Sequence, residues 1–98
     1  MFIRIVKMSF HQEHIPKFLG NFDLMKEKIR NAPGNRFLEL YQDKTNPEVF
    51  FTYSFWETEA DLESYRNSEL FYDVWQFTKQ LFNAKPEAWS VDKVVSLP

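Results

Sequence analysis

The segment from Glu48 to Trp56 constrains the fold of this chain more than any other. It consists mainly of aromatic and β-branched residues, which favour a strand. Because side chains alternate between the two faces of a strand, one face carries Val49, Phe51, Tyr53 and Phe55, and the other carries Phe50, Thr52, Ser54 and Trp56. Both faces are partly apolar. The sheet that contains this strand therefore needs cover on both sides.

The rest of the chain supplies three more strands and the helices to pack on them. Strands are predicted at Phe2 to Met8, Asn35 to Gln42 and Trp89 to Leu97. Apolar residues at helical spacing predict helices at Glu13 to Asn31, from Thr58 through Tyr65, and at Glu69 to Phe82. This order predicts an α+β class, ferredoxin-like fold: a four-stranded antiparallel sheet with helices on one face, in a single domain spanning residues 1–98.

Aromatic residues exceed what one small core needs, with 11 Phe, 4 Tyr and 3 Trp among 98 residues. Helices can cover only one face of such a sheet, and a solvated face would be polar. No chain is left to cover the second face, so a homodimer is expected, with the sheets of two copies facing each other.

Charge and cysteine content argue against several classes of partner. The net charge is −2, from 12 basic and 14 acidic residues interspersed along the chain, so neither nucleic acid nor an anionic membrane is expected as a partner. RNA-recognition domains share this topology, but Glu48-Val49 stands where their motif needs a basic residue and glycine. The absence of cysteine and of a signal-like start predicts a cytoplasmic protein without disulfides or thiolate metal sites.

Several groups could carry chemistry, and each has a purely structural alternative. Trp56, Tyr65, Phe71, Tyr72 and Trp75 could line an apolar cavity with polar handles, or simply pack together. Glu39 could be a base with a raised pKa, but a residue of the sheet edge or a cross-strand partner of a basic residue is favoured. His11 and His14 lack a third ligand, so no metal site is expected and solvated side chains are favoured.

Three short motifs relate the sequence to a known family. They are Pro33-Gly34-Asn35-Arg36-Phe37, Phe55-Trp56-Glu57 and Ser68-Glu69-Leu70-Phe71. Over nearly the whole chain the sequence resembles the antibiotic biosynthesis monooxygenase family of dimeric α+β barrel proteins. The resemblance implies a paired sheet, and an activity among cofactor-free oxygenases of quinol-like polyphenols, haem-degrading enzymes and enzymes acting on small signalling molecules.

This sequence has some, but not all, of the residues typical of the family. Trp56 and Ser68 match family positions, whereas Tyr65 stands where many members have histidine and the haem degraders have tryptophan. Trp75 stands where the haem-degrading branch has its axial histidine, and the first strand lacks that branch's asparagine. Haem ligation by that route is therefore not expected.

The resemblance and the residues together predict a cofactor-free monooxygenase. Its substrate would be a small quinol-like or polyphenolic aromatic molecule, which itself reduces O₂. The candidate catalytic residues are Tyr65, Trp56, Thr52 and Glu39, and the candidate substrate-binding walls are Phe22, Phe37, Phe71 and Trp75. The alternative is a dimeric protein that binds a small aromatic molecule without turnover. Whether the sheet face of Thr52 and Trp56 looks toward the helices stays open at this point.

Overall fold

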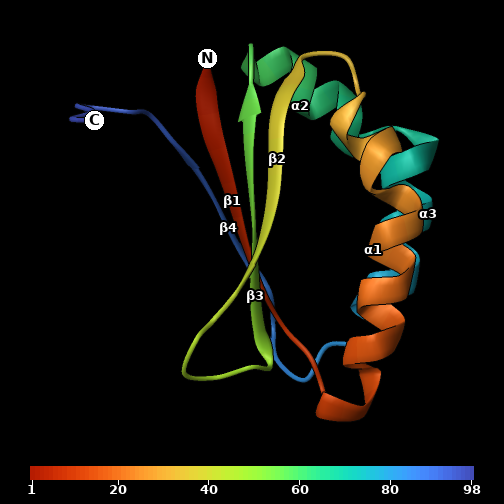
Figure 1. Cartoon of the computed structure of the whole chain (residues 1–98). Coiled ribbons are helices and arrows are strands. Elements are labelled where there is room, and N and C mark those ends of the chain that lie inside the picture. Colours follow the sequence, from red (N-terminus) through yellow and green to blue (C-terminus); the bar gives the residue numbers. More distant parts are fainter.

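A computed structural model describes residues 1–98 and contains one antiparallel four-stranded sheet in the order β2-β3-β1-β4. The strands are β1 (Phe2–Ser9), β2 (Asn35–Gln42), β3 (Val49–Trp56) and β4 (Glu87–Val91). The helices are the 3₁₀ turn η1 (Gln12–His14), α1 (Ile15–Arg30), α2 (Glu59–Arg66) and α3 (Glu69–Lys79). All helices lie on one side of the sheet (Figure 1). The predicted α+β, ferredoxin-like fold is confirmed.

The helices begin where the sequence supplies caps. Pro16 occupies the first turn of α1, where its missing N–H costs no helical hydrogen bond. The Thr58 hydroxyl oxygen accepts a hydrogen bond from the Asp61 backbone N–H at 3.1 Å at the start of α2. The Ser68 hydroxyl oxygen accepts one from the Phe71 backbone N–H, also at 3.1 Å, at the start of α3. These caps fix where the two short helices begin, and hence which side chains they turn toward the sheet.

The strand ladder settles which face of the sheet the helices cover. In the register, Trp56, Ser54, Thr52 and Phe50 of β3 stand beside Phe2, Arg4, Val6 and Met8 of β1. This face is the one packed against the helices, since Phe50 and Trp56 are almost fully buried. The alternate residues, including Phe51, Tyr53 and Phe55, face the side without helices (Figure 1).

Two separate apolar clusters join the sheet to the helices, one at each end of the strands. At one end Met8, Phe10, Phe18, Phe50 and Leu81 are buried together, with the rings of Phe10 and Phe18 stacked 4.2 Å apart. At the other end the buried residues are Phe2, Trp56 and Leu62. Between the clusters, β1 and β3 present Arg4, Val6, Thr52 and Ser54 instead of large apolar side chains. The apolar core therefore does not fill the space between the middle of the sheet and the helices.

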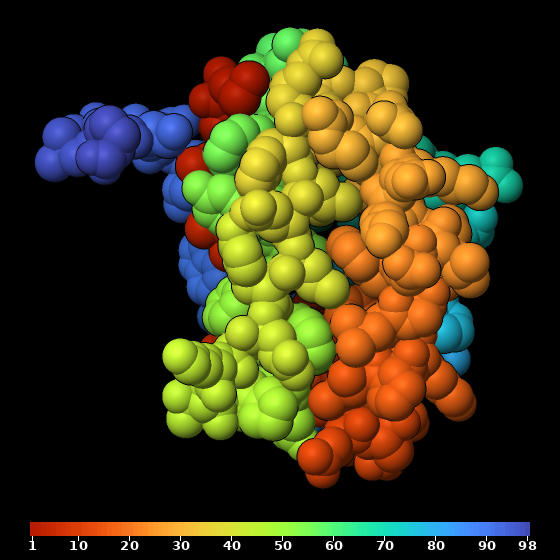
Figure 2. Space-filling model, viewed as in Figure 1, coloured from red at the N-terminus to blue at the C-terminus, as the bar shows by residue number.

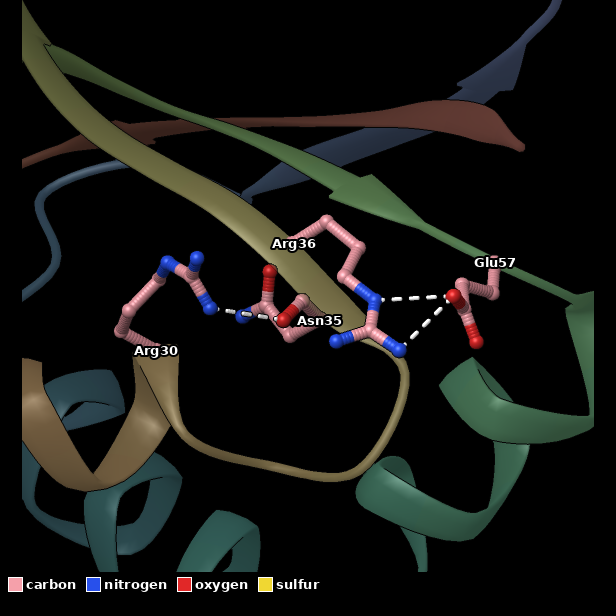
Figure 3. A network of polar contacts seen from close by, with 4 residues as sticks. All are labelled: Arg30, Asn35, Arg36 and Glu57. Carbon is pink, nitrogen blue, oxygen red and sulfur yellow. Dashed lines mark hydrogen bonds and ion pairs between the residues drawn. The ribbon is translucent and has the colours of Figure 1, made fainter.

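The connection from α1 to β2 is held by a compact polar network (Figure 3). The Arg30 guanidinium donates to the backbone oxygen of Asn35 at 2.8 Å, and the buried Asn35 amide donates to the Ile29 carbonyl at 2.9 Å. Arg36 pairs with Glu57 at 2.7 Å. The ladder shifts between Asn35 and Phe37, so Arg36 is the extra residue of a β-bulge. Consequently Asn35 and Phe37 pair with Trp56 and Phe55, on opposite faces of the sheet.

The predicted bounds of the last strand were wrong, and its pairing with β1 explains where it ends. The last strand begins at Glu87 and ends at Val91, instead of running from Trp89 to Leu97. Val91 pairs with Ile3, and β1 begins at Phe2, so the ladder runs out of partner backbone. Residues 92–98 leave the sheet and project from the molecule (Figures 1 and 2).

The helices also end differently from the prediction. Helix α3 ends at Lys79, because Phe82 instead forms an isolated bridge with Phe10. In α1, the apolar residue Leu19 is exposed. No helix has both the length and the apolar character that crossing a membrane requires.

We expect the two glycines to respond in opposite ways to alanine. Gly34 has φ +85°, and a Cβ there would clash with the Asp61 side chain, so Gly34→Ala should lower the free energy of unfolding by at least about 1–2 kcal/mol. Gly20 lies in α1 with open space around it, so Gly20→Ala should raise it by about 0.5–1 kcal/mol. Urea unfolding measures both. Equal effects would contradict the role of the Gly34 turn.

Candidate functional site

A cavity of about 270 Å³ lies between the sheet and the helices, in the region that the two apolar clusters leave unfilled. The sheet contributes Arg4, Val6, Leu38, Thr52 and Ser54 to its lining. The helices contribute Phe22 from α1, Tyr65 and Arg66 from α2, and Phe71, Val74 and Trp75 from α3. Most of the lining is apolar, with a few polar groups among the rings. Such a composition is typical of a binding site for a small organic molecule.

Aromatic rings form a continuous wall along the helical side. The Trp56 and Tyr65 rings lie 5.2 Å apart, and Tyr65 meets the edge of Phe71 at 5.2 Å. Phe71 stacks on Trp75 at 5.7 Å with an interplanar angle of 13°. The structure thus brings Trp56, Tyr65, Phe71 and Trp75 together as the sequence predicted, whereas Tyr72 points outward with 62% of its surface exposed. The nearly parallel rings of Phe71 and Trp75 suit a planar ligand.

Tyr65 supplies the hydroxyl group of this wall. No protein group hydrogen-bonds to that hydroxyl, and its oxygen is not fully buried, so the hydroxyl is free to bind a ligand. Burial raises the pKa of Tyr65 to about 12. The hydroxyl is therefore protonated at neutral pH. It can donate a hydrogen bond to a ligand but cannot serve as a base there.

Trp56 and Thr52 differ in what they offer. Trp56 is 1% exposed, and its indole N–H donates to the Ser54 hydroxyl oxygen at 3.0 Å. Because this N–H is already hydrogen-bonded, Trp56 shapes the cavity wall and does not offer a hydrogen-bond donor to a ligand. Thr52 is half-buried and lines the cavity from β3, on the side formed by the sheet. Ser68, which the family pattern singles out, caps α3 and also donates to the Tyr65 carbonyl at 2.6 Å, so it holds the wall in place.

Phe37 and Glu39 do not line the cavity. The prediction of Phe37 as a substrate-binding wall and of Glu39 as a candidate base of the same site is therefore wrong. They pair with Phe55 and Tyr53 on the sheet face without helices. The Phe37 ring stacks there on Phe55 at 4.7 Å, and the Glu39 carboxylate accepts a hydrogen bond from the Tyr41 hydroxyl. Phe22, the fourth predicted wall residue, does line the cavity. The bulge at Arg36 explains why Asn35 lines the cavity while Phe37 does not.

Sequence reasoning missed two arginines of the lining, Arg4 and Arg66. Arg4 shares a strand face with Phe2, Val6 and Met8, and a lone charge among apolar residues was a usable signal. Arg66 is the last residue of α2 and gave no such signal. Burial, and then the positive charge of Arg66, lower the pKa of Arg4, so the two guanidinium groups are close enough to repel.

The structure brings no three His, Cys, Asp or Glu side chains together as a metal site. His11 and His14 lie before α1, with ring centroids 5.7 Å apart, and neither lines the cavity. Trp75 lines the cavity, and none of the lining residues that α3 provides carries an imidazole. The lining offers an apolar site with a few hydrogen-bonding groups, as an organic molecule requires.

The model of one protein family, antibiotic biosynthesis monooxygenase, matches residues 1–75. The matched part includes the whole aromatic wall, from Trp56 to Trp75. A comparison with curated protein sequences finds no significant match.

Solved structures match over almost the full length. A crystal structure of an antibiotic biosynthesis monooxygenase is 21% identical, with a TM-score of 0.90, over 97% of this chain and 100% of that one. A conserved protein from Methanosarcina mazei Go1 is 21% identical, with a TM-score of 0.88, over 95% and 93%. A protein from Mycobacterium tuberculosis is 12% identical, with a TM-score of 0.87, over 99% and 98%. At these identities the likeness shows the fold.

The raised pKa of Tyr65 predicts how stability changes at alkaline pH. Above pH 10 an unfolded tyrosine loses its proton, whereas Tyr65 in the folded protein keeps it until about pH 12. The unfolded state then binds fewer protons, so the contribution is intact below pH 10 and is lost as pH rises toward 12. We expect Tyr65 to cost about 1 kcal/mol of unfolding free energy at pH 11.

Urea unfolding at pH 9 and pH 11 measures this loss, with Tyr65→Phe as the reference. Between pH 9 and pH 11, the free energy of unfolding should fall by about 1 kcal/mol less in Tyr65→Phe than in the wild type. Tyr72→Phe changes an exposed ring, so its free energy of unfolding should fall as much as that of the wild type. Identical pH dependence in the wild type and Tyr65→Phe would contradict the burial of this hydroxyl.

Proposed function

The chain belongs to the antibiotic biosynthesis monooxygenase family, and we propose that it is a cofactor-free monooxygenase of small quinol-like or polyphenolic aromatic molecules. The proposed ligand site is the cavity between sheet and helices. Its volume of about 270 Å³ lies near the lower end of ligand pockets, which favours a ligand of one or two rings. In this proposal the ring of the substrate lies along the wall of Phe71 and Trp75.

The observation that carries the proposal is that Tyr65 lines an apolar cavity and that its protonated hydroxyl has no protein hydrogen-bond partner. A quinol must lose a phenolic proton before it reduces O₂, and negative charge then develops on its oxygen. A fixed O–H donor in an apolar site stabilises such an oxyanion strongly. Tyr65 is therefore the proposed donor to the substrate oxygen, and Thr52 a second polar contact from the floor.

The proposed reaction balances without an added reductant. A naphthohydroquinone supplies four electrons to O₂; one oxygen atom enters the ring, the other leaves as water, and the product is a hydroxynaphthoquinone. The phenolic proton leaves to solvent, because Tyr65 cannot accept it at neutral pH. Water exclusion by the aromatic wall protects the anionic intermediate.

One observation favours the alternative of a binding protein without turnover. The cavity holds no histidine, and the carboxylate proposed as its base, Glu39, lies on the other face of the sheet. Glu87 belongs to the lining, but in the ladder it pairs with Lys7, on the face away from the helices. A missing base slows deprotonation by roughly 10²–10⁴-fold, so turnover is the property to measure.

We also propose that the open sheet face pairs with a second copy of the chain. The rings of Phe37, Tyr53 and Phe55 form one group there, with centroids 4.7–6.2 Å apart. Ile5 and Trp89 extend the apolar surface across β1 and β4. No helix covers this face (Figure 1). An apolar surface that crosses the whole sheet is typical of an interface between subunits.

Oxygen consumption with reduced naphthoquinones tests the proposed reaction. We expect saturable uptake above the rate of spontaneous oxidation, and about 100-fold lower kcat in Tyr65→Phe with little change in KM, because the lost hydrogen bond acts mainly on the developing anion. Tyr72→Phe, in the same helical region but exposed, should keep the wild-type rate.

The outcomes separate the two candidate functions. Full activity in Tyr65→Phe would contradict the donor role of Tyr65. Saturable binding of the quinol without any protein-dependent oxygen uptake would leave the binding protein as the function and remove the enzyme.

Light scattering tests the proposed pairing. We expect a mass close to twice 11.9 kDa for the wild type, and a monomer for Phe55→Glu, which buries a charge in the proposed interface. Leu24→Glu places the same charge on the exposed surface of α1 and should stay dimeric. A monomeric wild type at micromolar concentration would overturn the pairing.

A further inference from the structure

Two guanidinium groups line one cavity and come from distant parts of the sequence. Arg4 stands in the middle of β1 on the helix-covered face, between Ser54 of β3 and Ser90 of β4. Arg66 ends α2, directly after the aromatic Tyr65. Arg66 also lines a shallow hollow outside the cavity, together with Phe71 and Trp75. Arg66 therefore lies where the cavity meets the surface, and Arg4 is the less exposed of the two.

No carboxylate neutralises Arg4. Its guanidinium donates to the Ser90 hydroxyl oxygen at 3.0 Å, and none of the three ion pairs in the structure includes Arg4. A guanidinium has five N–H donors, so most of those on Arg4 are free to bind a ligand. Arg66 is paired only with Glu63, at 3.5 Å and with both side chains about half exposed. Such an exposed pair is weak and readily rearranged.

Two like charges facing one small, mostly apolar space raise the energy of the empty cavity. Half-burial removes part of the water around Arg4, and Arg66 adds repulsion; both effects lower the pKa of Arg4, while Glu63 opposes them only as the smallest contribution. An anion between the two groups would offset both costs. The chain as a whole has a net charge of −2, so the two arginines form a local concentration of positive charge in the cavity lining.

We infer that the cavity selects aromatic carboxylates, with the carboxylate held by Arg4 and Arg66 and the ring against Phe71 and Trp75. The planar fork of arginine matches the two oxygens of a carboxylate. The stacked rings of the wall match a flat apolar body. This inference rests on the proposed function in one respect: both take the cavity as the ligand site. It narrows the substrate class to aromatic molecules that carry an acid group.

A pair of probes that cannot be oxidised in this way tests the inference without turnover. 2-Naphthoate and 2-naphthamide have nearly the same shape and differ in charge, and their binding can be followed by quenching of tryptophan fluorescence. We expect naphthoate to bind the wild type at least about tenfold more tightly than naphthamide, the effect of a charged hydrogen-bonded pair.

Arginine variants locate the source of that preference. Arg4→Gln and Arg66→Gln should each reduce the ratio of the two affinities by about threefold or more, and the double variant should bring it close to one. Arg36→Gln removes an arginine that pairs with Glu57 away from the cavity, so it should keep the wild-type ratio. Naphthamide binding that persists in each variant shows that the cavity remains folded.

Three results would overturn the inference: equal binding of the two probes by the wild type, a preference that survives in the double variant, or no binding of either probe. The first two leave the proposed oxygenase intact if neutral naphthohydroquinones support oxygen uptake. The third removes the cavity as a ligand site and so counts against the proposed function as well.

Discussion

The burial of Trp56 is the interaction on which the rest of the structure depends. Its indole lies between the end of the sheet and α2, packed with Phe2 and Leu62, and its N–H is satisfied by Ser54. A buried indole with a satisfied donor contributes a large apolar area without a penalty for an unpaired polar group. Because its ring also meets Tyr65, Trp56 sets where the aromatic wall begins.

A second cluster, centred on Phe10 and Phe18, fixes the opposite end of the sheet. The helices are thus held at both ends, while Thr52 and Ser54 in the middle of β3 are too small to fill the space beneath them. Protein interiors are otherwise closely packed, so an unfilled region of this size costs stability. Retaining it makes sense if a ligand fills it, as the proposed function requires.

The sequence predicted the architecture well because the decisive signals were local. Alternation in β3, helical spacing in α1, and the caps at Thr58 and Ser68 each depend on a few neighbouring residues. The last strand was less predictable, because its end depends on where the paired strand β1 begins and not on its own composition. For the candidate site, most of the residues that the sequence groups around Trp56 lie together in the cavity lining, while Glu39, the candidate base, lies on the sheet face away from the cavity.

The sequence by itself determined the order of elements, the two apolar faces of β3 and the family. Only the tertiary structure decided which face the helices cover, because alternation gives two faces without saying which one packs inward. It alone revealed the bulge at Arg36, which turns Asn35 and Phe37 to opposite sides. It alone placed Arg4 and Arg66 in the lining of one cavity, since long-range strand pairing and helix docking bring together residues that are far apart along the chain.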